Sequence, residues 1–209
     1  MSPRRTASAT LAKPLPEETE PESRKQAILD SATEIFHRKG YHATSIQDIA
    51  HEVGMLKGSL YYYIDSKHEL LLQIITDVHA QAFSELQGVI ESDAPPSERL
   101  RQFIVRHAVF VATHRPAMGV FLHEYKSVEG PAKARVMAMR DLYETLLSGM
   151  IEDGQKDGSF RKEVNPKLTV KLILGMVNWL YHWYSEAGPM SPEEIGQAMA
   201  DMALRGIES

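Results

Sequence analysis

Apolar residues recur every three or four positions along most of the chain, which is the spacing of an amphipathic α-helix. Within residues 23–39, for example, Ile28, Ala32 and Ile35 fall on one stripe before Gly40 ends the pattern. We find no convincing alternation of apolar and polar residues of the kind that predicts a β-strand. The pattern predicts an all-α protein of about nine helices, at about residues 23–39, 44–51, 57–63, 66–91, 96–114, 117–126, 131–156, 166–186 and 192–206.

Several of these helices begin with a hydroxyl residue that is followed three positions later by Glu or Gln. In this capping box, each of the two side chains satisfies a backbone N–H group that the first helical turn leaves without a partner. The pattern occurs at Ser23–Gln26, Thr44–Gln47, Ser66–Glu69 and Ser191–Glu194. Asn165–Pro166 marks another start, with a cap residue followed by proline at the first helical position.

Charge is distributed unevenly along the 209 residues. The whole chain has 23 basic and 28 acidic side chains, a net charge of −5 that argues against a generally basic, nucleic-acid-binding surface. Residues 23–67 alone carry six basic and five acidic side chains. A DNA-binding element must therefore lie near the front of the chain and act through individually placed residues.

Composition also limits the chemistry and the location of the protein. The chain has no cysteine, which excludes disulfides, thiolate chemistry and cysteine-ligated metal sites. It has neither a secretory signal nor an apolar run long enough to span a bilayer, so we expect a cytoplasmic protein without a membrane partner. Residues 1–22 contain four prolines and alternating charge, and we expect them to form a flexible arm in which Arg4 and Arg5 are candidates for contact with phosphate.

The two short helices predicted at 44–51 and 57–63 flank a tight turn at Val53–Gly54–Met55. This is the spacing of a helix-turn-helix, whose second helix enters the major groove of DNA. The second helix contains three consecutive tyrosines, Tyr61–Tyr63. Because consecutive helical residues point about 100° apart, at least two of these phenols must face solvent or a partner.

Residues 44–70 follow the pattern Thr44-Ser45-Ile46-x-Asp48-Ile49-Ala50-x-x-Val53-Gly54-x-x-Lys57-Gly58-Ser59-Leu60-Tyr61-x-Tyr63-Ile64-x-Ser66-Lys67-x-x-Leu70. Together with Ala32, Phe36 and Gly40-Tyr41 upstream, this pattern resembles the N-terminal domain of the tetracycline-repressor (TetR) family of bacterial regulators over about residues 25–72. The resemblance implies a flexible arm at 1–22, a DNA-binding domain at 23–68 and a ligand-binding and dimerisation domain at 69–209.

The resemblance also implies which residues meet double-stranded operator DNA. Its phosphate contacts fall on Thr44, Lys57, Tyr61, Tyr62 and Lys67, and Ser45, Gly58, Ser59 and Tyr63 would lie close to phosphates or base edges. Two positions depart from the family pattern. Leu56 replaces the Ser or Thr that usually caps the second helix, and Ile64 replaces an aromatic residue.

The remainder of the chain carries no signal of an enzyme. It has no phosphate-binding glycine-rich loop, no His-Glu-x-x-His motif and no Gly-x-Ser-x-Gly motif, so we expect no catalysis and no cofactor. His107, His114 and His123 are spaced seven and nine residues apart, which fits no compact metal site. We therefore predict no metal ion and interpret these residues as ordinary core or surface histidines.

The last two predicted helices carry more apolar surface than packing within a single bundle would bury. Helix 166–186 is apolar over much of its circumference, so it must be buried on more than one side. The resemblance implies that helices 166–186 and 192–206 pair with those of a second copy, giving a homodimer that binds a palindromic operator. The candidate interface residues are Leu172, Met176, Leu180, Trp183, Tyr184, Ile195, Met199 and Met202.

A regulator of this kind would hold a small-molecule effector in its bundle. The candidate lining residues are rich in methionine and aromatic side chains, which tolerate a variable apolar guest: Phe110, Met118, Phe121, Leu122, Tyr125, Met139, Tyr143, Leu146 and Trp179. Residues 175–191 resemble a subset of the family that is released by acyl-coenzyme A thioesters. Two alternatives remain open, namely a regulator of efflux that responds to a hydrophobic drug or signal molecule, and an all-α lipid-binding protein without a role on DNA.

Overall fold

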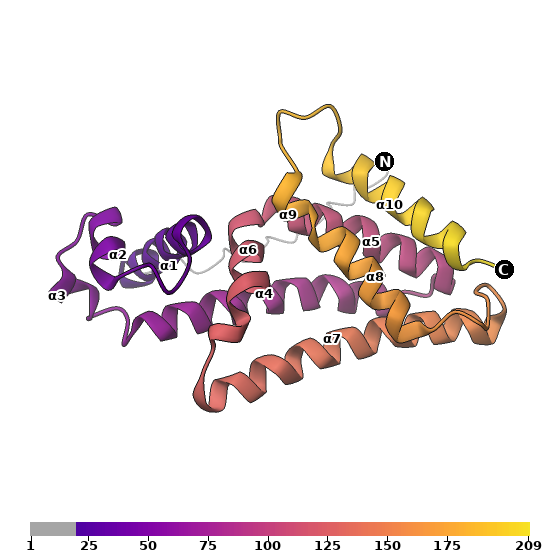
Figure 1. Ribbon diagram of the computed structural model, residues 1–209, viewed down its shortest axis with the longest axis horizontal. Coiled ribbons are helices and arrows are strands. Elements are labelled where there is room, and N and C mark those ends of the chain that lie inside the picture. The colour runs from indigo at the N-terminus through magenta and orange to yellow at the C-terminus, as the bar shows by residue number, and fades with distance from the viewer. Residues whose placement is uncertain (1–19) are drawn as a thin grey trace, which may run out of the picture.

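The computed structural model describes residues 20–209, and most of this range is helical (Figure 1). Extended pairing among these residues is confined to one antiparallel bridge between Phe160 and Glu208, so the predicted all-α class is confirmed. The arm predicted at 1–22, with Arg4 and Arg5, lies almost entirely outside the described residues. The helices are α1 (Glu20–Lys39), α2 (Ile46–Glu52), α3 (Lys57–Leu60), α4 (Lys67–Ile90), α5 (Pro96–Thr113), α6 (Arg115–Glu124), the 3-10 helix η1 (Tyr125–Ser127), α7 (Gly130–Asp157), α8 (Pro166–Asn178), α9 (Leu180–Trp183) and α10 (Pro192–Ile207).

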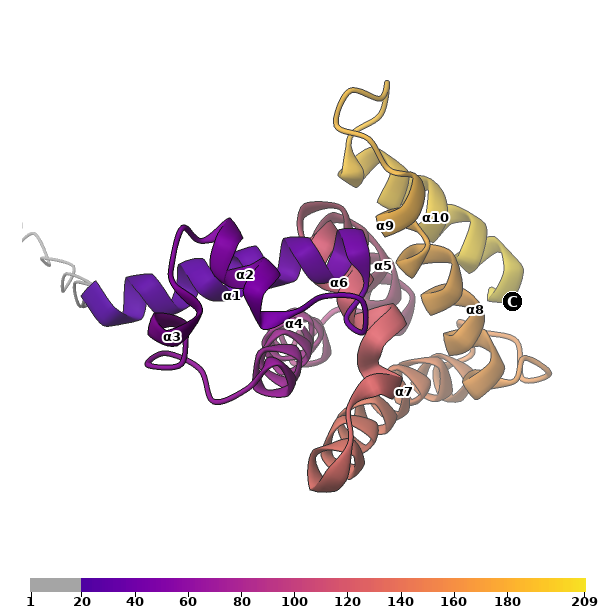
Figure 2. The ribbon, with the colours of Figure 1, turned by 60° about the vertical axis from the view of Figure 1, so that its left-hand side comes forward.

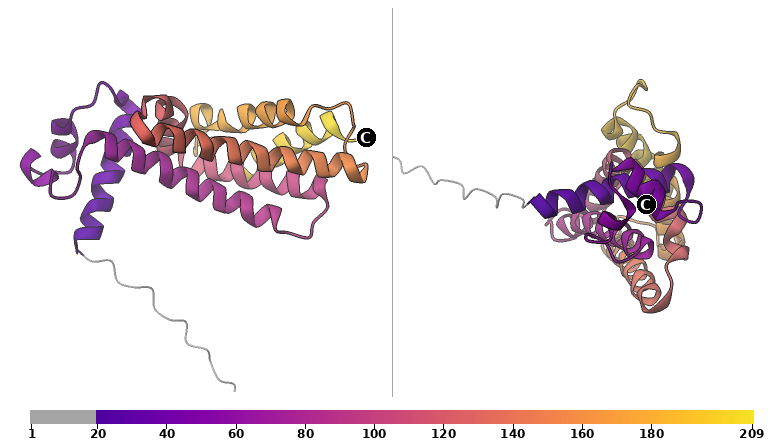
Figure 3. Two further views of the ribbon diagram at one scale, coloured as in Figure 1. Left: turned by 90° about the horizontal axis from the view of Figure 1, so that it is seen from below. Right: turned by 90° about the vertical axis from the view of Figure 1, so that its left-hand side faces the viewer.

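The molecule is elongated, with α1–α3 at one end and the longer helices in the rest of the structure (Figure 1). α4 begins next to α3 and continues into the bundle, so both parts share it. Figure 3 shows α4, α5 and α7 running along the long axis, whereas α1 crosses that direction steeply. α6 packs against α1, α4 and α9, and it therefore lies between the N-terminal helices and the bundle (Figure 2).

Two apolar cores follow this division. The first joins α1–α3 to the first half of α4 and includes Phe36 and Leu60, and the second fills the bundle around Ile104. α6 contributes to both cores, because Val120 belongs to the first and Met118 to the second. Since protein interiors are close-packed, a movement of α6 disturbs the packing on both sides.

The contact between α1 and α6 depends on a glycine. A Cβ atom at Gly119 of α6 would overlap the ring of His37, which extends from α1 across this position. The missing side chain therefore lets the two helices approach closely at the junction between the N-terminal helices and the bundle.

The helix-turn-helix has the predicted turn but a shifted first cap. Gly54 has a φ of +69°, the left-handed conformation that glycine adopts most easily. α2 is capped by Ser45, whose hydroxyl accepts a hydrogen bond from the Asp48 N–H group, so the capping box predicted from Thr44 is wrong by one residue. The second helix, α3, ends at Leu60, and Tyr61–Tyr63 form a turn after it rather than its last turn.

Other helix boundaries agree with the predictions more closely. The Ser191–Glu194 capping box and the Asn165 cap are both present. α1 begins at Glu20, so Ser23 lies inside the helix and its predicted capping box is wrong. The helix predicted at 166–186 is interrupted at Trp179, which separates α8 from α9. None of the described helices combines the length and the apolar character needed to cross a lipid bilayer.

Candidate nucleic-acid interface and ligand cavity

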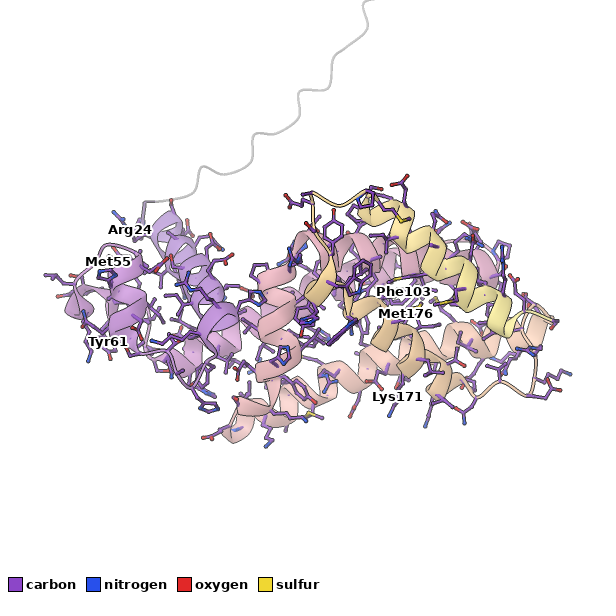
Figure 4. The ribbon with its side chains drawn as sticks, turned by 45° about the horizontal axis from the view of Figure 1, so that its top comes forward. Arg24, Met55, Tyr61, Phe103, Lys171 and Met176 are labelled. Carbon is purple, nitrogen blue, oxygen red and sulfur yellow. The ribbon has the colours of Figure 1, made fainter. Side chains whose placement is uncertain are left out.

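α3 and the turn after it present an unusually exposed set of side chains. Tyr62 is 88% exposed, Leu56 79% and Tyr61 49%, whereas Tyr63 packs against the core of the N-terminal helices. The prediction that at least two of the three phenols face outward is therefore confirmed. Figure 4 shows Tyr61 at the end of the molecule that is remote from α10. Leu56 occupies the cap position of α3 and supplies no side-chain hydrogen bond there.

Lys57 and Gly58 complete this surface. Both residues are exposed, and a Cβ atom at Gly58 would meet nothing within 4 Å. The backbone at Gly58 is thus open to close approach by a partner. An ammonium group, two phenol hydroxyls and an open backbone are all groups that contact phosphate in protein–DNA complexes.

The start of α2 is held by a cluster of polar groups. The Asp48 carboxylate accepts hydrogen bonds from the Ser45 N–H group at 2.7 Å and the Ser45 hydroxyl at 2.8 Å, and Lys39 Nζ donates to it at 2.9 Å. These bonds, that of Lys39 first, hold the pKa of Asp48 well below its usual range. The negative charge also lies in the first turn of α2, where it complements the helix dipole.

Thr44 does not fit the predicted phosphate contact. Its side chain is only 2% exposed, and its hydroxyl donates to the Gly40 carbonyl at 2.8 Å. Its N–H group donates to the Tyr41 carbonyl at 3.2 Å. Because both of its donors are used within the chain, we correct the prediction and exclude Thr44 from the interface.

Lys67 holds the turn between α1 and α2. Its ammonium group donates to the carbonyls of Tyr41 at 2.9 Å and Thr44 at 2.8 Å, and it lies 4.3 Å from the centre of the Tyr41 ring. Two of the three ammonium protons are therefore directed at these backbone carbonyls. The residue that the sequence assigns to DNA contact has a structural role in addition.

A second side chain holds the same turn from the bundle side. Glu124, the last residue of α6, accepts a hydrogen bond from the Tyr41 N–H group at 3.0 Å. Next to it, a ring nitrogen of His42 lies 3.0 Å from the Ser127 hydroxyl. No local pattern along the chain predicts these contacts, because the paired residues are more than 80 positions apart.

The bundle encloses a small cavity of about 60 Å³ between α4, α5, α6, α7 and α8. A cavity of this size has room for a few water molecules. Most of its wall is apolar. The wall residues are Val78, His79, Ala82, His107, Met118, Phe121, Leu122, Arg140, Tyr143, Glu144, Leu174 and Asn178.

Four of the predicted lining residues line this cavity, namely Met118, Phe121, Leu122 and Tyr143. The other five do not line it. Phe110 is buried and stacks on His114, and Tyr125 packs beneath Arg140. Met139 and Leu146 are half-buried outside the cavity wall. Trp179 points outward and is 54% exposed.

A hydrogen-bonded chain of three side chains crosses one wall of the cavity. The Tyr143 hydroxyl lies 3.2 Å from His107 Nδ1, and His107 Nε2 lies 2.8 Å from Asn178 Oδ1. Since the amide oxygen can only accept, Nε2–H donates to it and Nδ1 accepts from Tyr143. Burial lowers the pKa of His107 to about 4 and raises the pKa of Tyr143. Both groups are therefore neutral at pH 7, and together they link α5, α7 and α8.

The residues predicted for the dimer face fall into an exposed group and a buried group. Leu172, Trp183 and Met202 are exposed, and Met176 is half-buried on the groove between α8 and α10. The remaining candidates are buried within the bundle's own core and cannot meet a partner: Leu180, Tyr184, Ile195 and Met199. Because helix 166–186 is apolar almost all round, its sequence did not distinguish the inward stripe from the outward one.

The double role of Lys67 predicts a difference between two lysines of the N-terminal domain. Lys67→Ala removes two charge-assisted hydrogen bonds and should lower the free energy of unfolding by about 2 kcal/mol. Lys57→Ala, at an exposed position without an ion pair in the described part of the chain, should change it by less than about 0.5 kcal/mol. Urea denaturation followed by circular dichroism measures both values. Equal effects of the two substitutions would contradict the structural role of Lys67.

The buried His107 predicts acid sensitivity. Its pKa is about 4 in the folded protein, whereas histidine in an unfolded chain titrates near about 6.5. Below about pH 6.5 the unfolded chain takes up a proton that the folded protein does not, so stability should fall progressively toward pH 4, by about 3 kcal/mol from this residue alone. His107→Gln keeps a polar group without a proton to gain, and its stability should decline less steeply with pH. Urea denaturation measures the free energy of unfolding of both proteins. If this free energy falls equally with pH in wild type and in His107→Gln, protonation of His107 is not the cause.

Both halves of the chain match models of one protein family. Residues 28–74 match the model described as bacterial regulatory proteins, tetR family. Residues 93–207, more than half of the chain, match the model described as tetracyclin repressor-like, C-terminal domain.

Individual relatives agree with this assignment over nearly the whole chain. The HTH-type transcriptional repressor KstR2 of Mycolicibacterium smegmatis is 25% identical over 190 residues, which cover 90% of this chain and 93% of KstR2. The structure of the TetR family transcriptional regulator PfmR from Thermus thermophilus is similar with a TM-score of 0.78 and 33% identity, covering 87% of this chain and 99% of PfmR. The structure of AibR in complex with isovaleryl coenzyme A and operator DNA has a TM-score of 0.78 and 28% identity, covering 86% of this chain and 97% of AibR. The chain therefore belongs to the TetR family of DNA-binding transcriptional regulators, and it is not an enzyme.

Proposed function

We propose that this protein is a dimeric repressor that binds a palindromic operator and leaves it when an acyl-coenzyme A thioester enters the bundle. It would act in the cytoplasm, where its operator lies. One observation supports the response to an effector above all. Three of the residues in the cavity wall belong to α6, the helix that also holds the N-terminal domain.

The proposed DNA contacts centre on α3. Lys57, Tyr61 and Tyr62 offer donors to phosphate oxygens, and the open backbone at Gly58 allows the duplex to approach. Leu56, exposed at the start of α3, is suited to an apolar contact with a thymine methyl group. The other candidates for DNA contact are Ser59 and Tyr63, which are half-buried, and Ser45 and Lys67, which lie at the starts of α2 and α4.

The proposed dimer face is the outward side of the last helices. Leu168, Leu172, Trp179, Trp183 and Met202 are large apolar side chains that are all exposed on α8, α9 and α10. Leu168, Leu172 and Met202 line one groove between α8 and α10. Exposed apolar patches mark interaction sites in proteins that work in water. A second copy related by two-fold symmetry would cover the patch and place two α3 helices on one side of the dimer, as a palindromic operator requires.

The choice of a thioester rests on charge at one end of the cavity. The Arg140 guanidinium lies 4.0 Å from the centre of the Tyr125 ring, and Lys126 Nζ lies 5.8 Å from the same centre. Arg140 also belongs to the cavity wall, so an acyl chain in the cavity would place the coenzyme's phosphates toward these two cations. Lys133 and Arg135 are exposed basic side chains in the first part of α7, the helix that carries Arg140. AibR, which is similar to this chain, is described with isovaleryl coenzyme A bound.

The small cavity suggests how effector and operator exclude each other. Ligand sites usually enclose about 300–1,000 Å³, so the walls must move apart to admit an effector. Met118, Phe121 and Leu122 of α6 would be displaced first, because they form one side of the cavity. Displacement of α6 pulls on its last residue, Glu124, and through it on the turn that precedes α2. The effector would then favour a conformation in which the two α3 helices no longer match the operator.

Operator binding tests the proposal with two substitutions that leave the fold intact. Lys57→Ala should weaken binding to the protein's own upstream region about tenfold and reduce the slope of log affinity against log salt by about one. Gly58→Ala should also weaken binding, because the added methyl group meets nothing in the free protein but lies on the proposed DNA surface. Lys162→Ala, an exposed lysine at the far end of the bundle, is the control for charge. Fluorescence anisotropy measures all four proteins, and unchanged affinity of both α3 variants would overturn the proposed interface.

A further inference from the structure

A groove lies at the junction between the DNA-binding helices and the bundle, separate from the cavity described above. It has a volume of about 600 Å³ and is lined by residues of α1, α4 and the start of α6, where α1 crosses the direction of α4 (Figure 3). Its floor is apolar, because it consists of the buried side chains of Leu29, Ile74 and Val78.

The rim of the groove is acidic. Asp30 and Glu34 of α1 and Asp77 of α4 line it, and no lysine or arginine lines it in the described part of the chain. Asp30 and Asp77 accept hydrogen bonds from the uncharged amides of Gln26 and Gln73. Among the residues that the structure describes, none of the three carboxylates forms an ion pair with lysine or arginine. The groove therefore suits a partner that is both apolar and basic.

Residues 1–16 have the complementary chemistry. Leu11 and Leu15 lie on either side of a lysine in this segment. Residues 13 and 15 each precede a proline, which favours an extended chain at both positions. The segment carries three basic side chains and no acidic one, and the basic residues are Arg4, Arg5 and Lys13.

The segment is long enough to reach the groove from its attachment to α1. The helix begins at Glu20, and its residues between Gln26 and Glu34 line the groove. Along α1, the distance from Glu20 to Glu34 is about 21 Å at a rise of 1.5 Å per residue. Residues 4–19 span up to about 50 Å when extended, which leaves enough chain to turn back along the helix. Because the segment is tethered, its effective concentration at the groove is high, on the order of millimolar.

We propose that residues 1–16 dock in the groove of their own chain, with the leucines on its floor and the basic side chains at its acidic rim. The docked segment would contact α1 of the N-terminal domain together with α4 and α6, and it would thus bridge the junction between this domain and the bundle. The charge pairs at the rim are open to solvent, so salt should weaken the docking.

A spin label on the segment tests the docking in the full-length protein without DNA. The chain has no cysteine, so Ala9→Cys carries a nitroxide at one defined place. In NMR spectra of protein labelled on its isoleucine methyl groups, the nitroxide should broaden the signal of Ile74 on the groove floor. It should leave the signal of Ile207 unchanged, because this residue lies at the opposite end of the molecule from α1–α3 (Figure 1). The same sample with the nitroxide reduced is the reference.

Charge reversal in the groove tests what holds the segment. Asp30→Lys combined with Glu34→Lys should abolish the broadening of Ile74, and both positions are exposed, so the fold should tolerate lysine there. Glu152→Lys combined with Glu163→Lys makes the same change in charge at exposed positions elsewhere in the bundle and should keep the broadening. Raised salt should abolish it in the spin-labelled protein without charge reversal.

Reversal of the charges on the segment completes the test. Replacing its three basic residues by glutamate should also abolish the broadening of Ile74, and combining this change with the two groove substitutions should restore it. A spin-labelled protein whose Ile74 signal is not broadened would overturn the proposal, and so would broadening that survives both groove substitutions and raised salt. If Ile74 is unaffected and the glutamate variant binds the operator more weakly, the segment belongs to the DNA interface instead. Broadening of Ile74 in unlabelled protein that is mixed with spin-labelled protein would overturn docking within one chain.

Discussion

The position of the DNA-binding helices depends on hydrogen bonds to one short turn. The backbone of Tyr41 is held on both sides, since its N–H group donates to Glu124 of α6 and its carbonyl accepts from Lys67 of α4. α2 begins within a few residues of this turn, and α3 follows across the Gly54 turn. The placement of α3 relative to the bundle therefore depends on two charged side chains and on the close contact of Gly119 with His37, in addition to the apolar core that α1–α3 share with α4 and α6.

These contacts make α6 a natural link between effector and operator. The helix has only ten residues, yet it takes part in both apolar cores and in the cavity wall, and it ends in the carboxylate that holds the turn. A cavity of about 60 Å³ cannot admit an effector unless its walls, including α6, move apart. An effector that fits only an enlarged cavity has very different affinities for the two conformations, which is the condition for shifting their populations.

The sequence predicted the elements that depend on local pattern. Periodicity predicted the helices, and turn chemistry predicted Gly54. The crowding of three tyrosines predicted that at least two of them face outward, and in the structure these are Tyr61 and Tyr62. Local pattern could not decide which of two neighbouring hydroxyl residues caps α2. Thr44 and Ser45 are both hydroxyl residues three positions before a polar side chain, and only the folded turn buries the first and exposes the second.

Contacts between helices that are distant in sequence could not be predicted from local pattern. α8 and α9 are apolar on most sides, so the inward stripe with Leu180 and the outward stripe with Trp179 could not be told apart before the bundle was assembled. The partners of Tyr41 arise from contacts between separate helices. They could not be inferred from spacing, because no pattern along the chain records which helices meet.

The central claim, that α6 transmits cavity occupancy through Glu124, is tested most directly by the coupling between operator and effector. Operator affinity would be measured with and without the thioester that releases the wild-type protein most strongly, for wild type, Glu124→Gln and Glu124→Ala. The glutamine variant keeps an acceptor for the Tyr41 N–H group and should retain most of the ratio of affinities, whereas the alanine variant should reduce it by on the order of fivefold. An alanine variant that binds the effector normally and shows the wild-type ratio would contradict the account.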